Sequence, residues 1–532
     1  ITNAVTFSNT GSVTFGFSNI IFNGGVTATA PSLVNIAGII SSSNDTISIG
    51  DSDTPIVLTY YTTISANAGN ITLGGTVNGN YDLEIYTTGT TTLSGIIGGT
   101  DPLISLTTNT GGTLAINTTG ITTTGNQTFG ENVTLGADVT LTASITGNIS
   151  FAGTIESTSL ARALTVNTYG ITTFSGTVGA TLPYLASVTT NAGGSTAING
   201  GSVRTTGAQT YGDNVTLGAD TTLTALTTSF AGTLNSTTSA RDLTFGTGSG
   251  NVTFTGAVGS GTALDVITNI AGQTLTFSGA VTATTIANYG TLLFNATSAK
   301  TISPAITDNG DTTIQVISNN NSNISLITFS GSVAADTITV GSSAKAGSAL
   351  FSGAVSGTNI SIIGGDAASS AENSQATFAD TVTVTAITLD NNTSSATATF
   401  SGATKTITGT INGAAAGEGT IVVSGTPTFA SIIGGTNRIA QLTINGATTF
   451  QDAVSTTLLT TTAAISSGTT LNVSGASSIG ANVSTTGNQT YTGAVTLTAS
   501  PTLTSPSGTI LFSSTVNGAY ALTITNSGGS NT

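Results

Sequence analysis

A segment of 21 residues occurs twice in this 532-residue chain, with four substitutions between the copies. Residues 123–143 read TTGNQTFGENVTLGADVTLTA, and residues 205–225, which lie 82 positions later, read TTGAQTYGDNVTLGADTTLTA. A looser third copy, TTGNQTYTGAVTLTASPTLT, begins at Thr485. Internal repeats of this kind indicate an array in which each unit packs only against its neighbours. The core of such an array lengthens without thickening, so a long chain needs no division into separate globular domains.

Apolar and polar residues alternate along the repeated segment, which is the period of a β-strand. The apolar positions are Phe129, Val133, Leu135, Ala137, Val139, Leu141 and Ala143, and the polar positions between them are Thr128, Asn132, Thr134, Asp138, Thr140 and Thr142. Successive strand side chains point to opposite faces, so the first set is predicted to line a core and the second to face water or a neighbouring strand. Glu131 is an exception to this alternation. Helix is predicted to be nearly absent, because no 3.6-residue stripe occurs.

A shorter period is visible in the motif Phe-x-Gly and its close variants. The motif begins at Phe151, Phe174, Phe230, Phe254, Phe277, Phe329, Phe351 and Phe400. Neighbouring copies are commonly 22 to 24 residues apart, which is the size of one turn of a β-solenoid with two or three short strands. We therefore predict an all-β, elongated parallel β-solenoid of about 20–25-residue coils and about two dozen turns, with aligned apolar residues forming internal ladders. The 82-residue repeat would hold about four turns.

The repeat is more faithful in the earlier part of the chain than in the later part. We expect a regular solenoid with the 82-residue super-repeat over residues 1–290, a less regular solenoid with loop insertions over 291–480, and terminal coils over 481–532. Loops are predicted at residues 319–323, 364–374 and 412–419, where Asn, Gly, Ser and Ala interrupt the alternation.

The segments TTGNQTFGENVTLGADVTLTA and TFSGTVGATLPYLASVTTNAGG resemble the β-strand repeats of large bacterial surface proteins, namely filamentous haemagglutinins and autotransporter passenger domains. The resemblance covers most of the chain and lies in the general pattern of the repeats. It implies a right-handed parallel β-helix that is exported and displayed at the bacterial cell surface as an adhesin or a structural stalk. Repeats of this sort specify a fold better than they specify a function.

Composition excludes several kinds of chemistry. The chain has 22 acidic and 7 basic residues, and the basic ones are scattered, which argues against nucleic acid as a partner. It contains no Cys, Met, His or Trp, so thiol chemistry, disulfides and imidazole bases are excluded. No run of about 18 apolar residues occurs, so no helical membrane span is predicted. The first residue, Ile1, indicates a processed product or an excerpt.

We predict that the chain is not an enzyme. A Ser or Thr nucleophile would need a base, and the only alternatives to His, namely Lys300, Lys345 and Lys405, lie in Ser, Thr and Ala contexts common to the whole chain. A β-helix that cleaves acidic polysaccharides would need clustered carboxylates and a basic residue. The candidates recur with the repeat, as the pairs Arg162 and Arg241, Glu131 and Asp213, and Asp138 and Asp220. Recurrence favours a structural role over a unique active site.

The sequence requires no cofactor, and calcium is the one candidate cofactor that it suggests. Asp51, Asp53, Asp308 and Asp311 are the candidate ligands, because they place carboxylates at predicted turns. The alternative is that these residues form the turns themselves, through side-chain to backbone hydrogen bonds. Glycans are a further candidate partner, since Asn-x-Thr/Ser triplets begin at Asn70, Asn117, Asn132, Asn148 and Asn214.

The remaining function classes are structural. We expect a secreted or cell-surface β-solenoid with a structural or adhesive role, located outside the cell, whose partners are host or matrix surfaces. The first alternative is a self-assembling subunit of an extracellular filament or S-layer, in which the partner is another copy of the chain, because residues 1–7 and 521–525 read as strands and unpaired strand edges recruit partners. A polysaccharide-binding or polysaccharide-cleaving β-helix is the further alternative.

Overall fold

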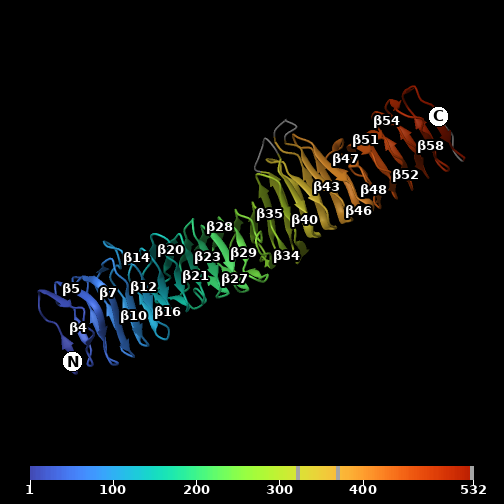
Figure 1. Ribbon diagram of the computed structural model, residues 1–532. Coiled ribbons are helices and arrows are strands. Elements are labelled where there is room, and N and C mark those ends of the chain that lie inside the picture. The colour runs from blue at the N-terminus through green and yellow to red at the C-terminus, as the bar shows by residue number, and fades with distance from the viewer. Residues whose placement is uncertain (319–323, 367–371, 528–532) are drawn as a thin grey trace. The chain divides into compact units, whose positions relative to one another are not determined.

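The computed structural model describes residues 1–318, 324–366 and 372–527. These residues form no α-helix, and their strands build a parallel β-solenoid of about 23 turns with about 22 residues each. The predicted fold class and turn length are therefore confirmed. The chain divides into two compact units, Ile1–Ile267 and Thr268–Thr532. Strands of successive turns lie side by side within each unit (Figure 1).

Parallel strands of the first unit run in three sets. The first set contains β1 (Val5–Thr6), β4 (Val26–Ala28), β6 (Ile47–Ile49), β8 (Ile71–Leu73), β11 (Thr90–Leu93), β13 (Thr113–Ile116), β16 (Asn132–Leu135) and β19 (Ile155–Ser157). The second contains β2 (Ser12–Phe15), β5 (Leu33–Ser41), β7 (Ile56–Asn67), β10 (Leu83–Thr87), β12 (Leu106–Thr108), β15 (Gln127–Phe129), β18 (Ile149–Phe151), β21 (Ile171–Phe174), β23 (Ser195–Ile198), β26 (Asn214–Leu217) and β29 (Leu234–Ser236), with β3 (Ile20–Ile21) beside β5 and β9 (Val77–Asn78) beside β7. The third contains β14 (Gly120–Thr123), β17 (Val139–Ala143), β20 (Ala163–Thr168), β22 (Ser187–Thr190), β24 (Ser202–Arg204), β25 (Ala208–Tyr211), β27 (Thr221–Thr224), β28 (Thr227–Phe230), β30 (Leu243–Phe245), β31 (Val252–Phe254) and β32 (Leu264–Thr268).

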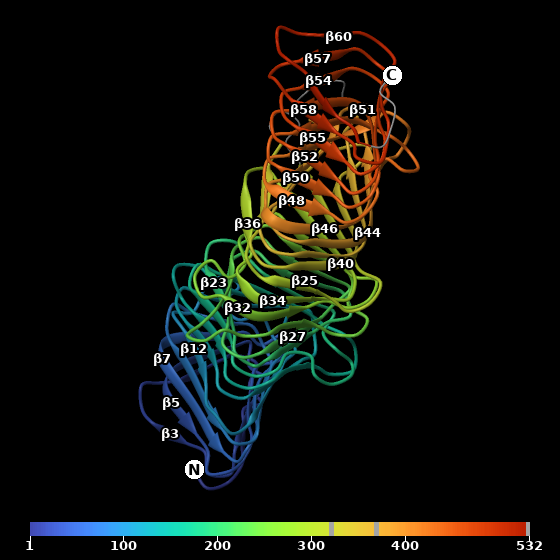
Figure 2. The ribbon, with the colours of Figure 1, turned by 90° about the vertical axis from the view of Figure 1, so that its right-hand side faces the viewer.

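Strands of the second unit run in two main sets, and strands of both sets are labelled in Figure 2. One set contains β33 (Thr274–Phe277), β34 (Ala283–Asn288), β35 (Thr291–Ala296), β37 (Ala305–Asp308), β38 (Thr313–Ser318), β40 (Val333–Gly341), β42 (Val355–Ile363), β44 (Val382–Asp390), β46 (Ala403–Gly413), β48 (Thr426–Phe429), β50 (Thr448–Phe450), β52 (Ile465–Ser467), β55 (Val483–Thr485), β58 (Thr502–Thr504) and β61 (Thr523–Thr525). The other contains β36 (Lys300–Ile302), β39 (Leu326–Phe329), β41 (Ser348–Phe351), β43 (Ser374–Phe378), β45 (Ala396–Phe400), β47 (Glu418–Val423), β49 (Ile439–Ile444), β51 (Val454–Thr461), β53 (Leu471–Val473), β56 (Gln489–Tyr491) and β59 (Ile510–Phe512), with β54 (Ser477–Ile479), β57 (Val495–Leu497) and β60 (Val516–Asn517) beside them.

The interior is filled as the alternation predicts, with one exception. Val133, Leu135 and Leu141 are fully buried, and the threonines between them are partly or fully exposed. Ala137 was expected in the core, but it is only half-buried, because it lies in the corner between β16 and β17 rather than in a strand. Glu131 occupies a buried position despite its charge.

Aromatic ladders run through the core along the stacking direction, as predicted. In the first unit Phe129 stacks on Phe151 at a ring-centroid distance of 5.1 Å, and Phe151 stacks on Phe174 at 5.6 Å. In the second unit Phe351 lies between Phe329 and Phe378, at 5.0 and 5.3 Å. Such spacings follow from the separation of adjacent strands, which brings equivalent rings of successive turns into stacking contact.

The glycine of the Phe-x-Gly motif is required by close packing of the corners. A Cβ atom on Gly176 would lie 2.3 Å from the carbonyl oxygen of Gly153 in the preceding turn. A Cβ atom on Gly200 would in turn lie 2.0 Å from the carbonyl oxygen of Gly176. Backbone atoms cannot yield as a flexible side chain can, so the corner admits only glycine.

The 82-residue repeat does not equal a whole number of turns. We call a series of strands that pair from one turn to the next a column. β15 belongs to the column β12, β15, β18, β21, β23 and β26. Its copy, β25, belongs to a different column, which contains β17, β20, β22 and β25. The copy of β16, which is β26, lies in the column of β15 and is four turns further along. The repeat is therefore one strand short of four turns, and each copy is rotated by one face.

The predicted loops have different outcomes. Residues 319–323 and 367–371 lie outside the described residues, whereas Gly364 and Gly365 follow the end of β42 and Ser374 begins β43. The predicted loop 412–419 is shorter than expected, because β46 extends to Gly413 and β47 begins at Glu418, which leaves residues 414–417 as the turn. The division into residues 1–290, 291–480 and 481–532 stays a prediction.

Candidate functional site

The first pair of predicted calcium ligands lies in a tight turn of the first unit. Asp51 forms an antiparallel bridge with Thr54, and the Asp53 N–H donates to Asp51 Oδ1 at 3.0 Å. Both aspartates are exposed. A shallow cleft of about 530 Å³ adjoins Asp51 and is lined by Thr29, Ser48, Gly50, Asp51, Ser52, Thr72, Gly74, Gly75, Thr76, Ser94 and Gly95. Asp51 thus makes the side-chain to backbone hydrogen bond of an aspartate turn.

The second pair lies in the turn that follows β37. Asp308 Oδ1 accepts hydrogen bonds from the Gly310 N–H at 3.3 Å and from Thr312 Oγ1 at 2.9 Å. Asp311, which is exposed, lies in the same turn. The two pairs belong to different units, and among residues 1–318, 324–366 and 372–527 the structure gathers no group of three or more Asp, Glu, His or Cys side chains that could hold a metal ion. The hydrogen bonds of Asp51 and Asp308 agree with the turn-forming interpretation, and calcium binding at these turns stays an untested alternative.

The repeated acids Glu131 and Asp213 are buried at the edge of the core. Asp213 Oδ1 accepts hydrogen bonds from the hydroxyls of Thr190, at 3.1 Å, and Thr196, at 2.8 Å. Glu131 Oε2 accepts one from the hydroxyl of Thr108. Burial raises the pKa of both carboxyls, and the threonine hydrogen bonds oppose that effect.

The other repeat pairs also keep the same contacts in both copies. The backbone N–H of Arg162 donates to Ser157 Oγ at 3.0 Å, and the backbone N–H of Arg241 donates to Ser236 Oγ at 3.0 Å. The exposed residues Asp138 and Asp220 each accept a backbone N–H from the next turn, at 3.0 and 3.2 Å. These local contacts agree with a structural role for residues that recur with the repeat.

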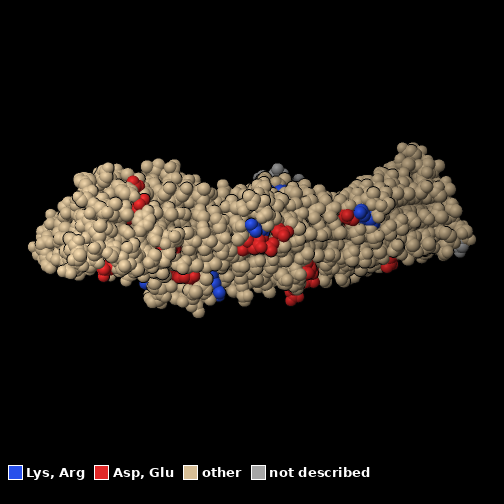
Figure 3. All heavy atoms as spheres, turned by 60° about the horizontal axis from the view of Figure 1, so that its bottom comes forward, with Lys and Arg blue, Asp and Glu red and all other residues tan. Residues whose placement is uncertain are grey.

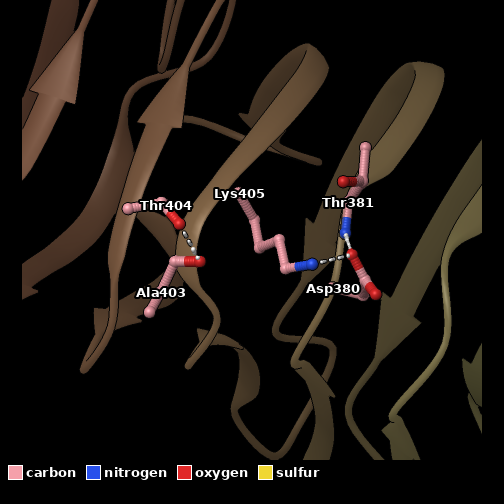
Figure 4. A network of polar contacts seen from close by, with 5 residues as sticks. All are labelled: Asp380, Thr381, Ala403, Thr404 and Lys405. Atoms are coloured by element: carbon pink, nitrogen blue, oxygen red, sulfur yellow. Dashed lines mark hydrogen bonds and ion pairs between the residues drawn. The ribbon is translucent and has the colours of Figure 1, made fainter.

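Lys405 lies beside a carboxylate rather than beside a hydroxyl nucleophile (Figure 4). Its Nζ is 2.8 Å from Asp380 Oδ1, which also accepts the Thr381 N–H at 2.6 Å. The hydrogen bond from Lys405 lowers the pKa of Asp380. Lys300 begins β36, and Lys345 lies in the turn after β40. On the face that Figure 3 shows, charged side chains form small separate groups on an otherwise uncharged surface.

The glycan-acceptor triplets are part of the turn-to-turn packing. The side-chain oxygens of Asn70, Asn132, Asn148 and Asn214 accept backbone N–H groups of the following turn, at 2.8 to 2.9 Å. A Cβ on Gly136 would lie 2.1 Å from Asn117 Oδ1. These asparagines therefore act as corner caps in the folded chain, and glycan attachment to them stays a prediction.

Sequence reasoning missed a row of exposed aromatic rings in the first unit, formed by Phe17, Tyr60 and Tyr81, which we call the aromatic row. The rings of Phe17 and Tyr60 are 5.3 Å apart, and those of Tyr60 and Tyr81 are 6.0 Å apart. Their exposed fractions are 75%, 53% and 36%. The available signal was the pair Tyr60 and Tyr61, which breaks the alternation of β7 with two adjacent large rings.

Comparison with known proteins finds no match among protein-family models, curated proteins or solved structures. Within the described part of the chain, no helix has the length and apolar character needed to cross a membrane.

Proposed function

We propose that this chain is a secreted or cell-surface β-solenoid scaffold with a structural or adhesive role. The observation that carries the proposal is the difference in composition between the inward and outward faces of the strands. Inward positions hold apolar ladders that join each turn to the next, and outward positions hold mainly uncharged Thr, Ser and Asn. A chain built in this way suits the display of an extended hydroxyl-rich surface.

One further feature supports an extracellular role, namely that the strand repeats resemble those of bacterial surface proteins. The absence of cysteine fits export in unfolded form, and it fits a reducing compartment equally well. The net charge of −15 favours solubility without forming a concentrated binding patch.

Surface location can be tested by labelling intact source cells with an antibody raised against the purified chain. We expect labelling without permeabilisation, and loss of the signal after brief protease treatment of the cells. Labelling that requires lysis would contradict the proposal. For the adhesive role, the purified chain should bind host or matrix material immobilised on a plate in a saturable manner, and a cysteine-free globular protein of similar charge serves as the control.

Lateral self-assembly into a filament or S-layer is a second candidate, favoured by one specific observation. A column of outward hydroxyl residues runs along one face of the first unit, through Thr140, Thr165, Thr189, Thr210, Ser229 and Thr253. No charged residue interrupts it. A uniform uncharged face of this kind can pack against a second copy without desolvating a charge.

Sedimentation and electron microscopy of the purified chain test this second candidate. Ordered sheets or fibres are expected if the column is a lateral contact, and the double variant Thr189→Lys/Thr210→Lys should abolish them by placing like charges at the contact. Lysines at the exposed positions Thr237 and Ser239, which are outside the column, provide the matched control. Dispersed particles at every concentration would exclude lateral assembly.

A further inference from the structure

Exposed aromatic side chains gather in one part of the first unit. Most aromatic rings of the chain fill the core, where they form the ladders described above. Among the described residues, the exposed aromatic side chains are Phe17, Tyr60, Tyr61, Tyr81, Tyr86, Tyr169, Tyr289 and Tyr520. The first five of these lie within residues 17–86, whereas the other three are distant from one another in the sequence. Scattered exposed apolar residues are ordinary, but a contiguous group of rings marks an interaction surface.

The backbone presents the aromatic row through a local irregularity. Ile36 of β5 pairs with Leu58 of β7, but Gly38 pairs with Thr62, so β7 carries extra residues that include Tyr60 and Tyr61. Bulges of this kind re-aim side chains away from the regular ladder. The hydroxyl of Thr62 donates to the carbonyl of Tyr60 at 3.0 Å and holds the bulge in place.

Gly38 allows Phe17 to join the row. It has a positive φ of 83°, and a Cβ at this position would lie 3.1 Å from the carbonyl oxygen of Phe17. Gly38 thus lets the backbone of β5 lie close to the backbone of Phe17, whose ring contacts the Tyr60 ring. The row therefore depends on three features of the sequence, namely the bulge, the glycine and the rings.

Hydrogen-bonding groups flank the row on β10. Glu84 lies at an outward position of this strand, and Asp82 lies between Tyr81 and the first residue of the strand, Leu83. The hydroxyl of Tyr86 donates to Glu84 Oε2 at 2.9 Å, and Ser105 Oγ donates to Asp82 Oδ1 at 2.5 Å. Glu84 also accepts the hydroxyl of Tyr61. Each carboxylate has acceptor capacity beyond these hydrogen bonds, and can accept hydroxyl groups of a ligand.

The charge around the row restricts what it can bind. Residues 1–161 contain nine acidic residues and no Lys or Arg. An anionic lipid surface or an acidic polysaccharide would meet only like charges there. An uncharged polyhydroxylated chain would find hydrogen-bond acceptors for its hydroxyls. Its C–H groups would contact the aromatic rings, because their partial positive charge complements the negative ring face.

We propose that the aromatic row is a binding surface for an uncharged glycan, whose successive sugar units contact the rings of Phe17, Tyr60 and Tyr81 while its hydroxyls donate to Asp82 and Glu84. The ring planes are inclined by 73° between Phe17 and Tyr60 and by 42° between Tyr60 and Tyr81, so the sugar units would meet rings of different orientation. Tyrosine suits this role because its ring gives a large contact area at a low cost in conformational entropy. The inference goes beyond the scaffold role, and its test on the purified chain is independent of where the chain is located.

The test is native electrophoresis of the full chain through gels that contain a soluble uncharged polysaccharide, using a β-glucan, a xylan and a mannan in turn, with alginate and polygalacturonate as acidic probes. At least one uncharged polysaccharide should retard the chain, and the acidic ones should not. The variant Tyr60→Ala/Tyr81→Ala should lower the affinity about tenfold or more, which is the loss expected for central aromatic contacts. Tyr60→Phe should keep the affinity, because the ring face is retained.

The matched control is Tyr169→Ala/Tyr289→Ala, which removes two tyrosines that are 65% and 41% exposed outside the row and should bind as the parent does. Circular dichroism of each variant checks that the fold is kept. Since the chain has no Trp, ligand-induced changes in tyrosine fluorescence give a second readout. Equal retardation of the row and control variants, the absence of retardation by every uncharged probe, or preferential binding to zwitterionic lipid vesicles would each overturn the proposal.

Discussion

A buried glutamine joins neighbouring strands in all three copies of the repeat. Gln209 Nε2 donates to the carbonyls of Val203 and Thr224, at 2.9 and 3.0 Å, and Gln489 Nε2 donates to Val483 and Thr504, at 3.2 and 2.8 Å. The equivalent nitrogen of Gln127 donates to the carbonyls of Ile121 and Thr142, at 3.2 and 2.9 Å. A polar side chain in an apolar core is tolerated when its hydrogen bonds are made.

The three copies differ in how the glutamine oxygen is satisfied. Tyr211 donates its hydroxyl to Gln209 Oε1 at 3.2 Å, and Tyr491 donates to Gln489 Oε1 at 3.1 Å. The first copy has Phe129 instead, and Gln127 Oε1 has no hydrogen-bond partner among the described residues.

We predict that Phe129→Tyr stabilises the chain by about 1 kcal/mol, because it supplies the missing donor to a buried acceptor. The reverse change, Tyr211→Phe, should cost about 1–3 kcal/mol by leaving Gln209 Oε1 unpaired. Thermal unfolding followed by circular dichroism compares both variants with the parent. A lower unfolding temperature for Phe129→Tyr would show that the first copy has no room for the hydroxyl.

Burial of Asp213 predicts a pH dependence of stability with a definite sign. A carboxyl whose pKa is raised in the folded chain keeps its proton at pH values where the unfolded chain has lost it. Its stabilising contribution is complete below the ordinary carboxyl pKa of about 3.9, and is lost as the pH rises from there through the raised folded value.

The variant Asp213→Asn should therefore lose less stability than the parent as the pH rises above about 4, because the neutral amide does not titrate. The unfolding temperature measured across this pH range checks the expectation, and Glu131→Gln should act in the same direction. Asp220→Asn is the control, since Asp220 is exposed in the same repeat copy. A parent chain that becomes more stable over this range, relative to Asp213→Asn, would contradict the assigned burial effect.

Stacked strands make stability a local property of neighbouring turns. Each turn of a solenoid contacts mainly the turn before and the turn after it, so a defect in one ladder position is felt there first. Phe351, at the end of β41, is a suitable probe because rings of the neighbouring strands β39 and β43 stack on both of its faces.

Phe351→Ala is expected to destabilise its surroundings by about 3–5 kcal/mol, through lost burial and a residual cavity. Hydrogen exchange should accelerate in β39, β41 and β43, while exchange in β56 stays as in the parent. Phe351→Leu should have a smaller effect at the same sites, since it retains most of the apolar volume. A uniform acceleration throughout the chain would instead indicate global cooperativity.

Thermal stability of the complete chain tests the calcium candidates. The carboxylates at Asp51 and Asp308 already accept turn hydrogen bonds, and calcium commonly takes six to eight oxygen ligands. We predict that the unfolding temperature in excess chelator matches the value in millimolar calcium to within about 1 °C, because a ligand that binds neither state strongly does not shift folding. A rise of several degrees with calcium, lost in Asp51→Asn/Asp53→Asn or in Asp308→Asn/Asp311→Asn, would locate a site.

Much of the fold was predictable because its rules act over short distances along the chain. Alternation identifies the inward residues, and the spacing of Phe-x-Gly gives the length of a turn. The interpretation of Arg162 and Arg241 as copies of one position is supported by their equivalent hydrogen bonds to Ser157 and Ser236. The Tyr60–Tyr61 pair was the one sequence signal of the aromatic row. Its geometry was not predictable, because Phe17, Tyr60 and Tyr81 are brought together by a bulge whose size depends on the pairing of β5 with β7.

Local sequence pattern was sufficient to specify an all-β array of short turns with a ladder core, since period and corner residues are properties of neighbouring positions. The face of the solenoid on which each repeat copy lies could be determined only from the strand pairing in the three-dimensional structure. Strands that are repeat copies of each other, such as β15 and β25, lie on different faces, because 82 residues fall one strand short of four turns. No local pattern encodes that offset, which is the accumulated sum of every corner and strand length between the two copies.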